Sequence, residues 1–217
     1  MHRRLFLTAL AGAAAAPTAL LAAQKEPVKL AKAYPFLELY LKLPAAERSR
    51  FAVVYYMTRD GKPAAGLRGW IVDAAAKIPV SWAADGRALQ LPTLAQAQGS
   101  ATIQFDVPDD AALKPRLELH PLMAAAAQVD AVALQASITQ AGAAVKKMAG
   151  PMAMMAPKIS AAQFPGAPSG QAMLATGKAL PLPAGKFGPL YDPGKEPGAR
   201  TITLARAPSR ILLTPSA

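Results

Sequence analysis

The stretch from Phe51 to Thr58 reads FAVVYYMT and runs directly into RDGKP, residues 59–63. β-Branched and aromatic residues favour strands, and an Asp-Gly pair favours a tight turn. These residues therefore predict a strand that ends in a hairpin turn. Shorter strand-like segments and a second turn signal, Asp85-Gly86, follow at close intervals, so residues 51–120 are predicted to form a small antiparallel sheet. The segments are Trp70–Val72, Ile78–Val80, Leu89–Leu91, Thr102–Val107 and Leu113–Leu119.

Helical patterns lie on both sides of this sheet region. Before it, apolar residues recur at helical spacing between Tyr34 and Arg48, which predicts a short amphipathic helix. After it, a long helix is predicted from a cap at Asp130 to Gly150-Pro151. The predicted fold class is therefore α+β, with antiparallel β-sheet packed on one long helix. The stripe of the helix that should face the sheet is Ala131, Leu134, Ile138, Ala141, Val145 and Met148.

A second group of strand-like segments follows the long helix. Two sequence matches link this group to the first sheet: residues 85–92 are similar to residues 176–183, and residues 99–103 to residues 198–202. We therefore expect two related helix-plus-sheet halves, residues 24–127 and residues 128–217. The alternative is that an alanine-rich composition and common turn residues produce the matches by chance. The segments are Lys158–Phe164, Gln171–Leu174, Lys178–Leu182, Thr201–Leu204 and Arg210–Leu213.

The N-terminal segment, residues 1–23, is typical of a bacterial export signal. Arg3 and Arg4 precede an uncharged run rich in alanine and leucine, and Phe6 and Leu7 complete an order that resembles the twin-arginine consensus. We expect the twin-arginine translocase to carry the folded protein to the periplasm. We also expect the signal to be cleaved, which leaves no stable membrane span. The alternatives are a Sec-type signal and retention of the segment as an N-terminal anchor.

The exported chain is strongly basic. Loss of Arg3 and Arg4 lowers the formal net charge from +11 to +9, because 22 of the 24 basic residues remain against 13 acidic ones. Such a balance favours anionic surroundings, in an envelope an acidic protein or an anionic glycan. The expected compartment excludes nucleic acid as a partner. The basic residues are scattered along the chain, so an ordinary solvated surface is the alternative interpretation.

Residue usage removes much of the common catalytic chemistry. Cysteine is absent, and His120 is the only histidine beyond the export signal. Thiolate chemistry and metal sites with several histidines are therefore impossible. A Ser-His-Asp arrangement would need His120, which lies at the end of a predicted strand, and the sequence contains no Gly-x-Ser-x-Gly motif. We assign no catalytic residue and predict no cofactor from these residues.

One segment has distinctive chemistry of its own. Met148, Met152, Met154 and Met155 lie within eight residues. Thioethers are soft ligands that select Cu(I), so these methionines form a candidate copper site. Methionine also fills irregular gaps in protein cores, and such packing between the long helix and the next strand is the alternative interpretation.

A second candidate site combines aromatic and basic residues of the first sheet: Tyr56, Arg59, Arg68, Trp70 and Trp82. Alternation along the strands would expose about half of the aromatic side chains, which would then stack on sugar rings or on a partner protein. The alternative places the aromatics in the core and the charges in solvated turns. The pair Asp109-Asp110 has no second acidic cluster to face, as glycoside hydrolysis would require.

The order of these segments resembles an uncharacterised, twin-arginine-exported periplasmic domain family of Gram-negative bacteria. The resemblance lies within residues 36–165 and rests on the Asp-Gly hairpin, the Leu-x-Leu-Pro segment, the long helix and the stretch from Gly150 to Ile159. The cysteines of some family members are missing here. No activity is established for the family, so the resemblance implies compartment and layout only.

These observations together lead us to expect an exported, non-enzymatic binding or accessory component of the cell envelope. A Cu(I)-binding protein that uses the Met148–Met155 segment is one alternative. An envelope hydrolase is another.

Overall fold

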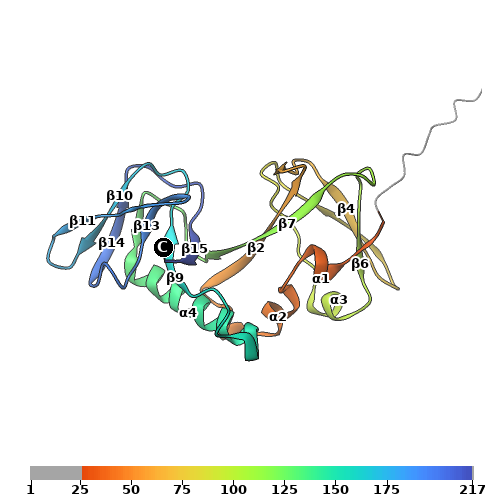
Figure 1. The fold of residues 1–217 in the computed structure, drawn as a ribbon, viewed down its shortest axis with the longest axis horizontal. Coiled ribbons are helices and arrows are strands. Elements are labelled where there is room, and N and C mark those ends of the chain that lie inside the picture. The colour runs from red at the N-terminus through yellow and green to blue at the C-terminus, as the bar shows by residue number, and fades with distance from the viewer. Residues whose placement is uncertain (1–25, 217) are drawn as a thin grey trace, which may run out of the picture.

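The computed structural model describes residues 26–216. The residues expected to form the export signal, Arg3, Arg4, Phe6 and Leu7 among them, lie outside this range. The described chain forms two lobes joined by strands that cross between them (Figure 1). We call residues 26–121 the first lobe and residues 128–216 the second lobe.

The first lobe begins with a short strand and a helical segment and continues with six more strands. Its elements in chain order are β1 Val28–Lys29, α1 Leu30–Ala33, α2 Leu37–Lys42, the 3₁₀ helix η1 Ala45–Arg48, β2 Phe51–Arg59, β3 Lys62–Pro63, β4 Arg68–Val72, β5 Lys77–Ser81, α3 Leu94–Gln98, β6 Thr102–Phe105 and β7 Leu113–Pro121.

The second lobe also begins with a short strand and a helix, here a long one. Its elements are β8 Gln128–Asp130, α4 Ala131–Ala149, the 3₁₀ helix η2 Gly150–Met152, β9 Ile159–Gln163, β10 Gly170–Leu174, β11 Ala179–Pro181, β12 Ala184–Gly185, β13 Gly188–Tyr191, β14 Ala199–Leu204 and β15 Leu212–Pro215.

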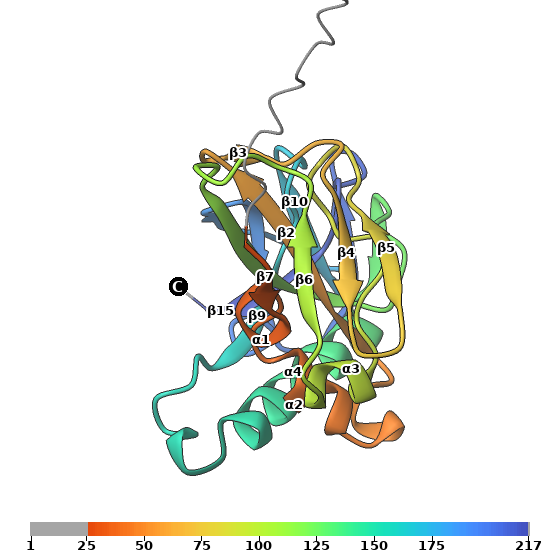
Figure 2. The ribbon, with the colours of Figure 1, turned by 90° about the vertical axis from the view of Figure 1, so that its right-hand side faces the viewer.

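The strands form three antiparallel sheets. One seven-stranded sheet, in the order β12-β13-β9-β15-β7-β2-β3, runs through both lobes. Each lobe adds a four-stranded sheet of its own, β1-β6-β4-β5 in the first and β8-β14-β10-β11 in the second. The side view shows the helices gathered at one end, beneath the sheets (Figure 2). The α+β class, with antiparallel sheets and one long helix, is confirmed.

The two four-stranded sheets have the same strand order relative to the chain. In the first, Ile103 of β6 pairs with Val28 of β1 on one side and with Ile71 of β4 on the other. In the second, Ile202 of β14 pairs with Val129 of β8 and with Ala172 of β10. Residues 99–103 and 198–202, which match in sequence, therefore occupy equivalent places. The other sequence match does not, because residues 85–92 follow β5 whereas residues 176–183 begin in the turn before β11.

The long helix α4 begins and ends where the sequence predicts. The Asp130 side chain caps it by accepting hydrogen bonds from the backbone N–H groups of Val132 and Ala133, at 2.8 and 3.0 Å. Gly150, with a φ of 53°, ends it. The helix packs against β9, β14 and β7, so it lies under both lobes (Figure 1). Its buried residues are Ala131, Leu134, Ser137, Ile138, Ala141 and Ala144, while Val145 and Met148 are partly buried against the core.

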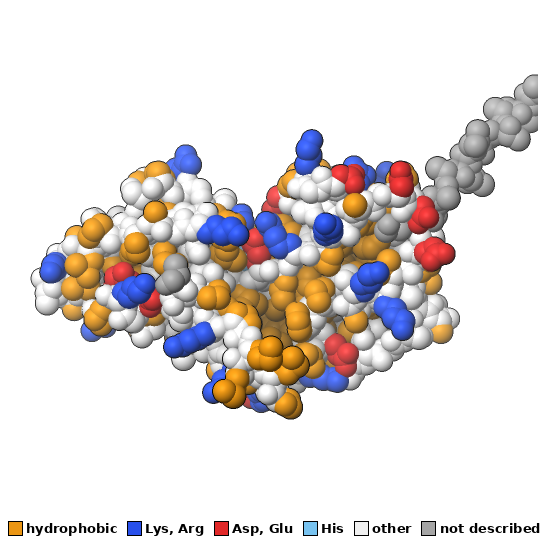
Figure 3. All heavy atoms as spheres, viewed as in Figure 1, with side chains coloured by type: hydrophobic (Ala, Val, Ile, Leu, Met, Phe, Trp, Pro, Cys, Tyr) orange, Lys and Arg blue, Asp and Glu red, His pale blue; other side chains and the backbone are white. Residues whose placement is uncertain are grey.

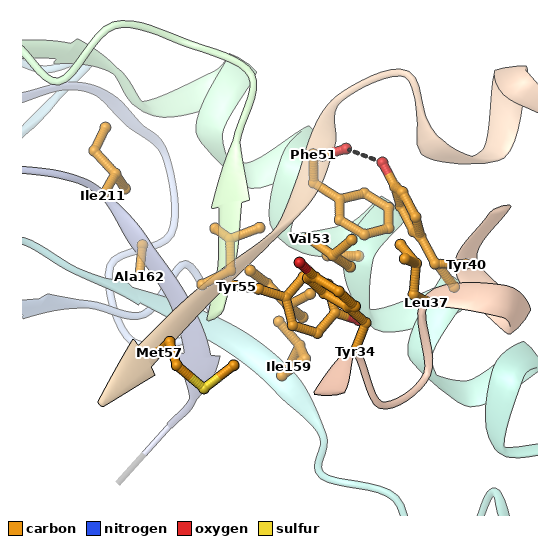
Figure 4. Packing of buried hydrophobic residues seen from close by; sticks show 14 of the residues in the cluster. Tyr34, Leu37, Tyr40, Phe51, Val53, Tyr55, Met57, Ile159, Ala162 and Ile211 are labelled. Atoms are coloured by element: carbon orange, nitrogen blue, oxygen red, sulfur yellow. Dashed lines mark hydrogen bonds between the residues drawn. The ribbon is translucent and has the colours of Figure 1, made fainter. Parts of the chain in front are cut away.

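The segment Phe51–Arg59 forms β2, the strand at the centre of the first lobe's core. Alternate residues of β2 point to one face and are almost fully buried: Phe51, Val53, Tyr55 and Met57. This face packs on Tyr34, Leu37 and Tyr40 from the α1–α2 segment (Figure 4). The Tyr34 and Tyr55 rings meet edge to face at 5.2 Å, and the Tyr40 hydroxyl donates to the Phe51 carbonyl at 3.3 Å. The opposite face of β2 lies toward the junction between the two lobes.

Three local predictions differ from the structure. The strands of residues 51–120 belong to two sheets, because β2, β3 and β7 join the second lobe while β4, β5 and β6 pair among themselves and with β1. The segment Tyr34–Arg48 was predicted to hold one short helix closed by Pro44, and it holds α2, Leu37–Lys42, before Pro44 and the 3₁₀ helix η1 after it. Residues 89–91 form no strand.

The short helix α3 was not predicted, although its start has a readable signal. Thr93 and Gln96 form a capping box, in which the Thr93 hydroxyl accepts from the Gln96 N–H and the Gln96 side chain accepts from the Thr93 N–H.

Across residues 26–216, none of the helices is long and apolar enough to cross a membrane.

We expect Gly142→Ala to destabilise the protein, because a Cβ at Gly142 in α4 would lie 2.8 Å from the Ile159 carbonyl oxygen of β9. Alanine gains about 1 kcal/mol of helix propensity over glycine, but overpacking against fixed backbone costs about 1–3 kcal/mol. Urea unfolding should therefore show a net loss of up to about 2 kcal/mol.

The reverse change at the neighbouring position serves as the control. Ala143 is exposed, so Ala143→Gly should lose only the propensity difference of about 1 kcal/mol. Stabilisation by Gly142→Ala would contradict the close contact between α4 and β9.

Candidate functional site

The face of the seven-stranded sheet that points away from the helices carries a cluster of polar side chains. Strands β2 and β7 pair along their whole length, with Tyr56 opposite Arg116, Val54 opposite Glu118 and Ala52 opposite His120. Because side chains alternate along a strand, Arg116, Glu118 and His120 share one face with Tyr56. Arg210 approaches the same face from the second lobe, just before β15. We call Tyr56, Arg116, Glu118, His120 and Arg210 the interlobe cluster.

The Glu118 carboxylate is the centre of this cluster. Arg210 donates to both of its oxygens, from Nε to Oε2 at 2.9 Å and from Nη2 to Oε1 at 3.3 Å. Arg116 Nη2 lies 3.1 Å from Oε1, and His120 Nε2 lies 2.8 Å from Oε2. The Glu118 side chain is only 6% exposed, so a buried charge is balanced by partners from both lobes.

The Tyr56 ring lies against both guanidinium groups. The Cζ atom of Arg116 is 4.8 Å from the ring centroid and that of Arg210 is 5.7 Å away. The electron-rich face of an aromatic ring attracts such cations. The ring therefore helps to hold two like charges close together.

The surroundings of Glu118 keep its carboxylate ionised. Burial alone would raise the pKa of Glu118, but the hydrogen bond from His120 and the charges of Arg210 and Arg116 outweigh it, so the pKa lies below its ordinary value of 4.5. Burial and the nearby Glu118 charge raise the pKa of the Tyr56 hydroxyl. At neutral pH the cluster thus contains a carboxylate and a neutral phenol.

The cluster has a surplus of positive charge. Two guanidinium groups and one carboxylate leave a net charge of +1 if the imidazole is neutral. The Arg116 side chain is half exposed and that of Arg210 a quarter exposed. Figure 3 shows the surface hollowed between the two lobes, with basic side chains on both sides of the hollow. This arrangement can bind an anion through guanidinium groups that face solvent.

The two arginines occupy equivalent places in the two lobes. Leu119 of β7 pairs with Leu213 of β15, so a half-turn that exchanges these residues also exchanges Arg116 with Arg210. The sequences agree, since Arg116-Leu117-x-Leu119-x-Pro121 corresponds to Arg210-Ile211-x-Leu213-x-Pro215. Arg116, Glu118 and Arg210 were not predicted as site residues from the sequence. This repeated pattern is the signal that could have found the arginines.

The predicted aromatic and basic surface is dispersed over different elements. Tyr56 belongs to the interlobe cluster but is 4% exposed, and Trp82 is 4% exposed and packs on Phe105 at 5.6 Å. Trp70 is half-buried in β4, where Lys77 Nζ lies 4.5 Å from its ring centroid. Arg59 and Arg68 are exposed at a strand end and a strand start. Of the five predicted residues, Tyr56 lies in the interlobe cluster, and the other four lie outside it.

The four predicted methionines divide into two groups. Met148 is partly buried against the core at the end of α4. Met152, Met154 and Met155 are 62%, 99% and 81% exposed. Packing in the core therefore accounts for Met148 but not for the other three.

The structure also buries two further carboxylates, Asp192 and Glu196, in the turn after β13. Asp192 Oδ1 accepts from the Gly194 N–H at 2.9 Å, and Glu196 Oε2 accepts from the Asp192 N–H at 2.8 Å. Both side chains thus close their own turn.

An apolar hollow of about 270 Å³ lies beside α1 and α2 and is lined by residues that include Leu30, Tyr34 and Phe36.

Comparison of the chain with family models, curated proteins and solved structures finds no match. The family resemblance stated above therefore stays a prediction. The site has to be interpreted from its own geometry.

We expect Glu118→Gln to cost about 1–3 kcal/mol of unfolding free energy, because it removes charge-assisted hydrogen bonds and leaves two guanidinium groups without a counter-charge. The control is Glu38→Gln, which breaks the exposed Glu38–Lys42 ion pair of 2.7 Å in α2. An exposed pair of this kind is worth about 0.5 kcal/mol or less. Urea unfolding of both variants provides the measurement.

The difference in unfolding free energy between the native protein and Glu118→Gln should depend on pH. The pKa of Glu118 is lowered by folding, so its stabilisation is complete above the ordinary value of 4.5 and is lost as pH falls through the lower folded-state value. The stability difference between the native protein and Glu118→Gln should therefore narrow as the pH falls from about 4.5 through the folded-state pKa of Glu118. A difference that stays constant from about pH 6 to about pH 3 would contradict the ion-paired state of Glu118.

Proposed function

We propose that this protein is an exported, non-enzymatic binding component of the bacterial cell envelope. Its ligand is an anionic envelope glycan, and the interlobe cluster holds a carboxylate or phosphate group of that glycan. The observation that carries the proposal is the convergence of Arg116 and Arg210, from two lobes, on the single buried carboxylate of Glu118.

Charge supports an anionic ligand over a neutral one. Glu118 compensates one of the two guanidinium groups, and the half-exposed Arg116 presents the remaining positive charge to solvent. Guanidinium groups match carboxylates and phosphates in shape as well as in charge. Without the export signal the chain carries a formal net charge of +9, from 22 basic and 13 acidic residues, which would draw polyanions toward the site.

The chemistry of the cluster supports binding over catalysis. A general acid at neutral pH needs a carboxyl group with a raised pKa, whereas the pKa of Glu118 is lowered by His120 and the two arginines despite its burial. Both Glu118 oxygens are engaged by these neighbours. Glu118 therefore anchors the two arginines. These contacts support binding by the cluster over hydrolysis.

The Tyr56 ring supports recognition by charge and not by stacking. The ring is buried and lies against the Arg116 and Arg210 guanidinium groups. It orients the cations that meet the ligand. A sugar ring would not reach it directly.

We expect the purified protein to bind a polyuronate oligomer and to bind its carboxyl-reduced, neutral counterpart much more weakly. Arg116→Gln should weaken binding of the polyuronate about tenfold, which corresponds to about 1.4 kcal/mol. Isothermal titration calorimetry at low ionic strength gives both affinities. Binding should also weaken as salt is added, because the contact is ionic.

Arg59→Gln is the matched control, since it removes one exposed positive charge at the end of β2 outside the cluster. Equal losses in the two arginine variants would mean that the polyanion senses only overall charge. That result would contradict the interlobe cluster as the binding site.

Export is tested separately. We expect the protein in the periplasmic fraction of its bacterial host, and we expect the double change Arg3→Lys and Arg4→Lys to retain the precursor in the cytoplasm, because the twin-arginine translocase reads the arginine pair. Fractionation followed by immunoblotting distinguishes the outcomes. Continued export of the lysine variant would favour a Sec-type signal, and a native precursor found only in the cytoplasm would contradict export.

A further inference from the structure

The chain that leaves α4 exposes three thioethers at one edge of the molecule. Met152, Met154 and Met155, which we call the methionine tip, are 62%, 99% and 81% exposed. Figure 3 shows hydrophobic side chains gathered over the lower edge of the molecule, where Figure 1 places the C-terminal end of α4. The sulfur atoms of the tip are therefore accessible to a ligand from solution.

The backbone of the tip folds the three methionines into consecutive turns. The Ala153 N–H donates to the Gly150 carbonyl at 3.0 Å, and the Met155 N–H donates to the Met152 carbonyl at 2.9 Å. In turns closed by bonds between residues i and i+3, the side chains of those residues lie on the same side. The Met155-to-Met152 bond continues the pattern of the 3₁₀ helix η2, so Met152 and Met155 are one such turn apart, and Met154 is adjacent in the chain. Each has three rotatable bonds with which to bring its sulfur to a common point.

The ligand chemistry of the tip selects a soft cation of low charge. Thioethers bind Cu(I) in preference to the harder divalent ions, which need carboxylate or imidazole ligands. Residues 26–216 contain no group of three or more His, Cys, Asp or Glu residues that could hold a metal. Lys146, Lys147 and Lys158 flank the segment in sequence, and Lys147 is paired with Glu47 at 2.7 Å. Positive neighbours of this kind disfavour a divalent cation more than a monovalent one.

We propose that the methionine tip binds one Cu(I) ion through the thioether sulfurs of Met152, Met154 and Met155. Met148 contributes by fixing the end of α4 in the core and not as a ligand. The site is independent of the interlobe cluster, so either proposal can fail without the other.

The test is an anaerobic titration of the purified protein with Cu(I) in competition with the chromophoric chelator bicinchoninate. We expect one Cu(I) per chain. The triple variant Met152→Leu, Met154→Leu and Met155→Leu should bind at least about tenfold more weakly. Leucine is close to methionine in volume and the positions are exposed, so the variant should fold like the native protein. Its urea unfolding curve checks this.

A matched control changes two half-buried methionines elsewhere, Met123→Leu and Met173→Leu, and should bind Cu(I) like the native protein. In processed protein labelled with ¹³C at the methionine methyl groups, Cu(I) should shift three of the seven signals that remain without Met1, those of the tip. Equal Cu(I) affinity of the native protein and the triple variant would overturn the proposal. So would tip methyl signals that do not move.

Discussion

The pairing of β7 with β15 is the contact on which the rest of the molecule depends. It is a narrow junction, with Leu119 opposite Leu213, yet it turns two groups of strands into one seven-stranded sheet. The Glu118 carboxylate and the Arg210 guanidinium cross the same junction. Backbone pairing fixes the distance between the lobes, and the buried ion pair fixes their register. Separation of the lobes would take Arg210 away from the Glu118 carboxylate and leave it with Arg116 and His120 of its own lobe. Loss of a partner of a buried charge costs more than loss of an exposed pair.

The two lobes are similar in topology but differ in the chemistry of the junction. Arg116 and Arg210 are equivalent, as are Leu119 and Leu213. At the positions between and beyond them the first lobe has Glu118 and His120, where the second has Leu212 and Thr214. One carboxylate therefore serves two arginines. A symmetric pair of carboxylates would have neutralised both guanidinium groups and left no surplus charge for an anion.

The long helix α4 links the two candidate sites while keeping them apart. Its buried face supports the sheet that carries the interlobe cluster, and its C-terminal end presents the methionine tip. Gly142 allows the helix to approach β9 closely, and Gly150 ends it at a positive φ that favours glycine. The cluster offers hard, cationic donors, whereas the tip offers soft, neutral sulfur. The two sites thus suit ligands of opposite charge.

Sequence alone determined the local elements, because their causes are local. The β-branched and aromatic run at Phe51–Thr58, the Asp130 cap and the Gly150 stop define a strand and a helix through propensity and capping. The repeat was visible in part, since residues 99–103 and 198–202 are equivalent and residues 85–92 and 176–183 are not. The Thr93–Gln96 capping box is a local signal of the same kind for α3, and Pro44 follows the end of α2.

Tertiary structure alone decided which strands pair and therefore where the site lies. Arg116 and Arg210 are far apart in the chain, and only the register of β7 against β15 brings both to Glu118. Tyr56 is buried beside the arginines of that junction, whereas Trp70 lies in β4 of another sheet, so the two aromatic side chains expected on one surface are separated. Alternation tells which residues share a face of one strand. It does not tell which face a distant segment will cover, because that depends on contacts between residues far apart in sequence.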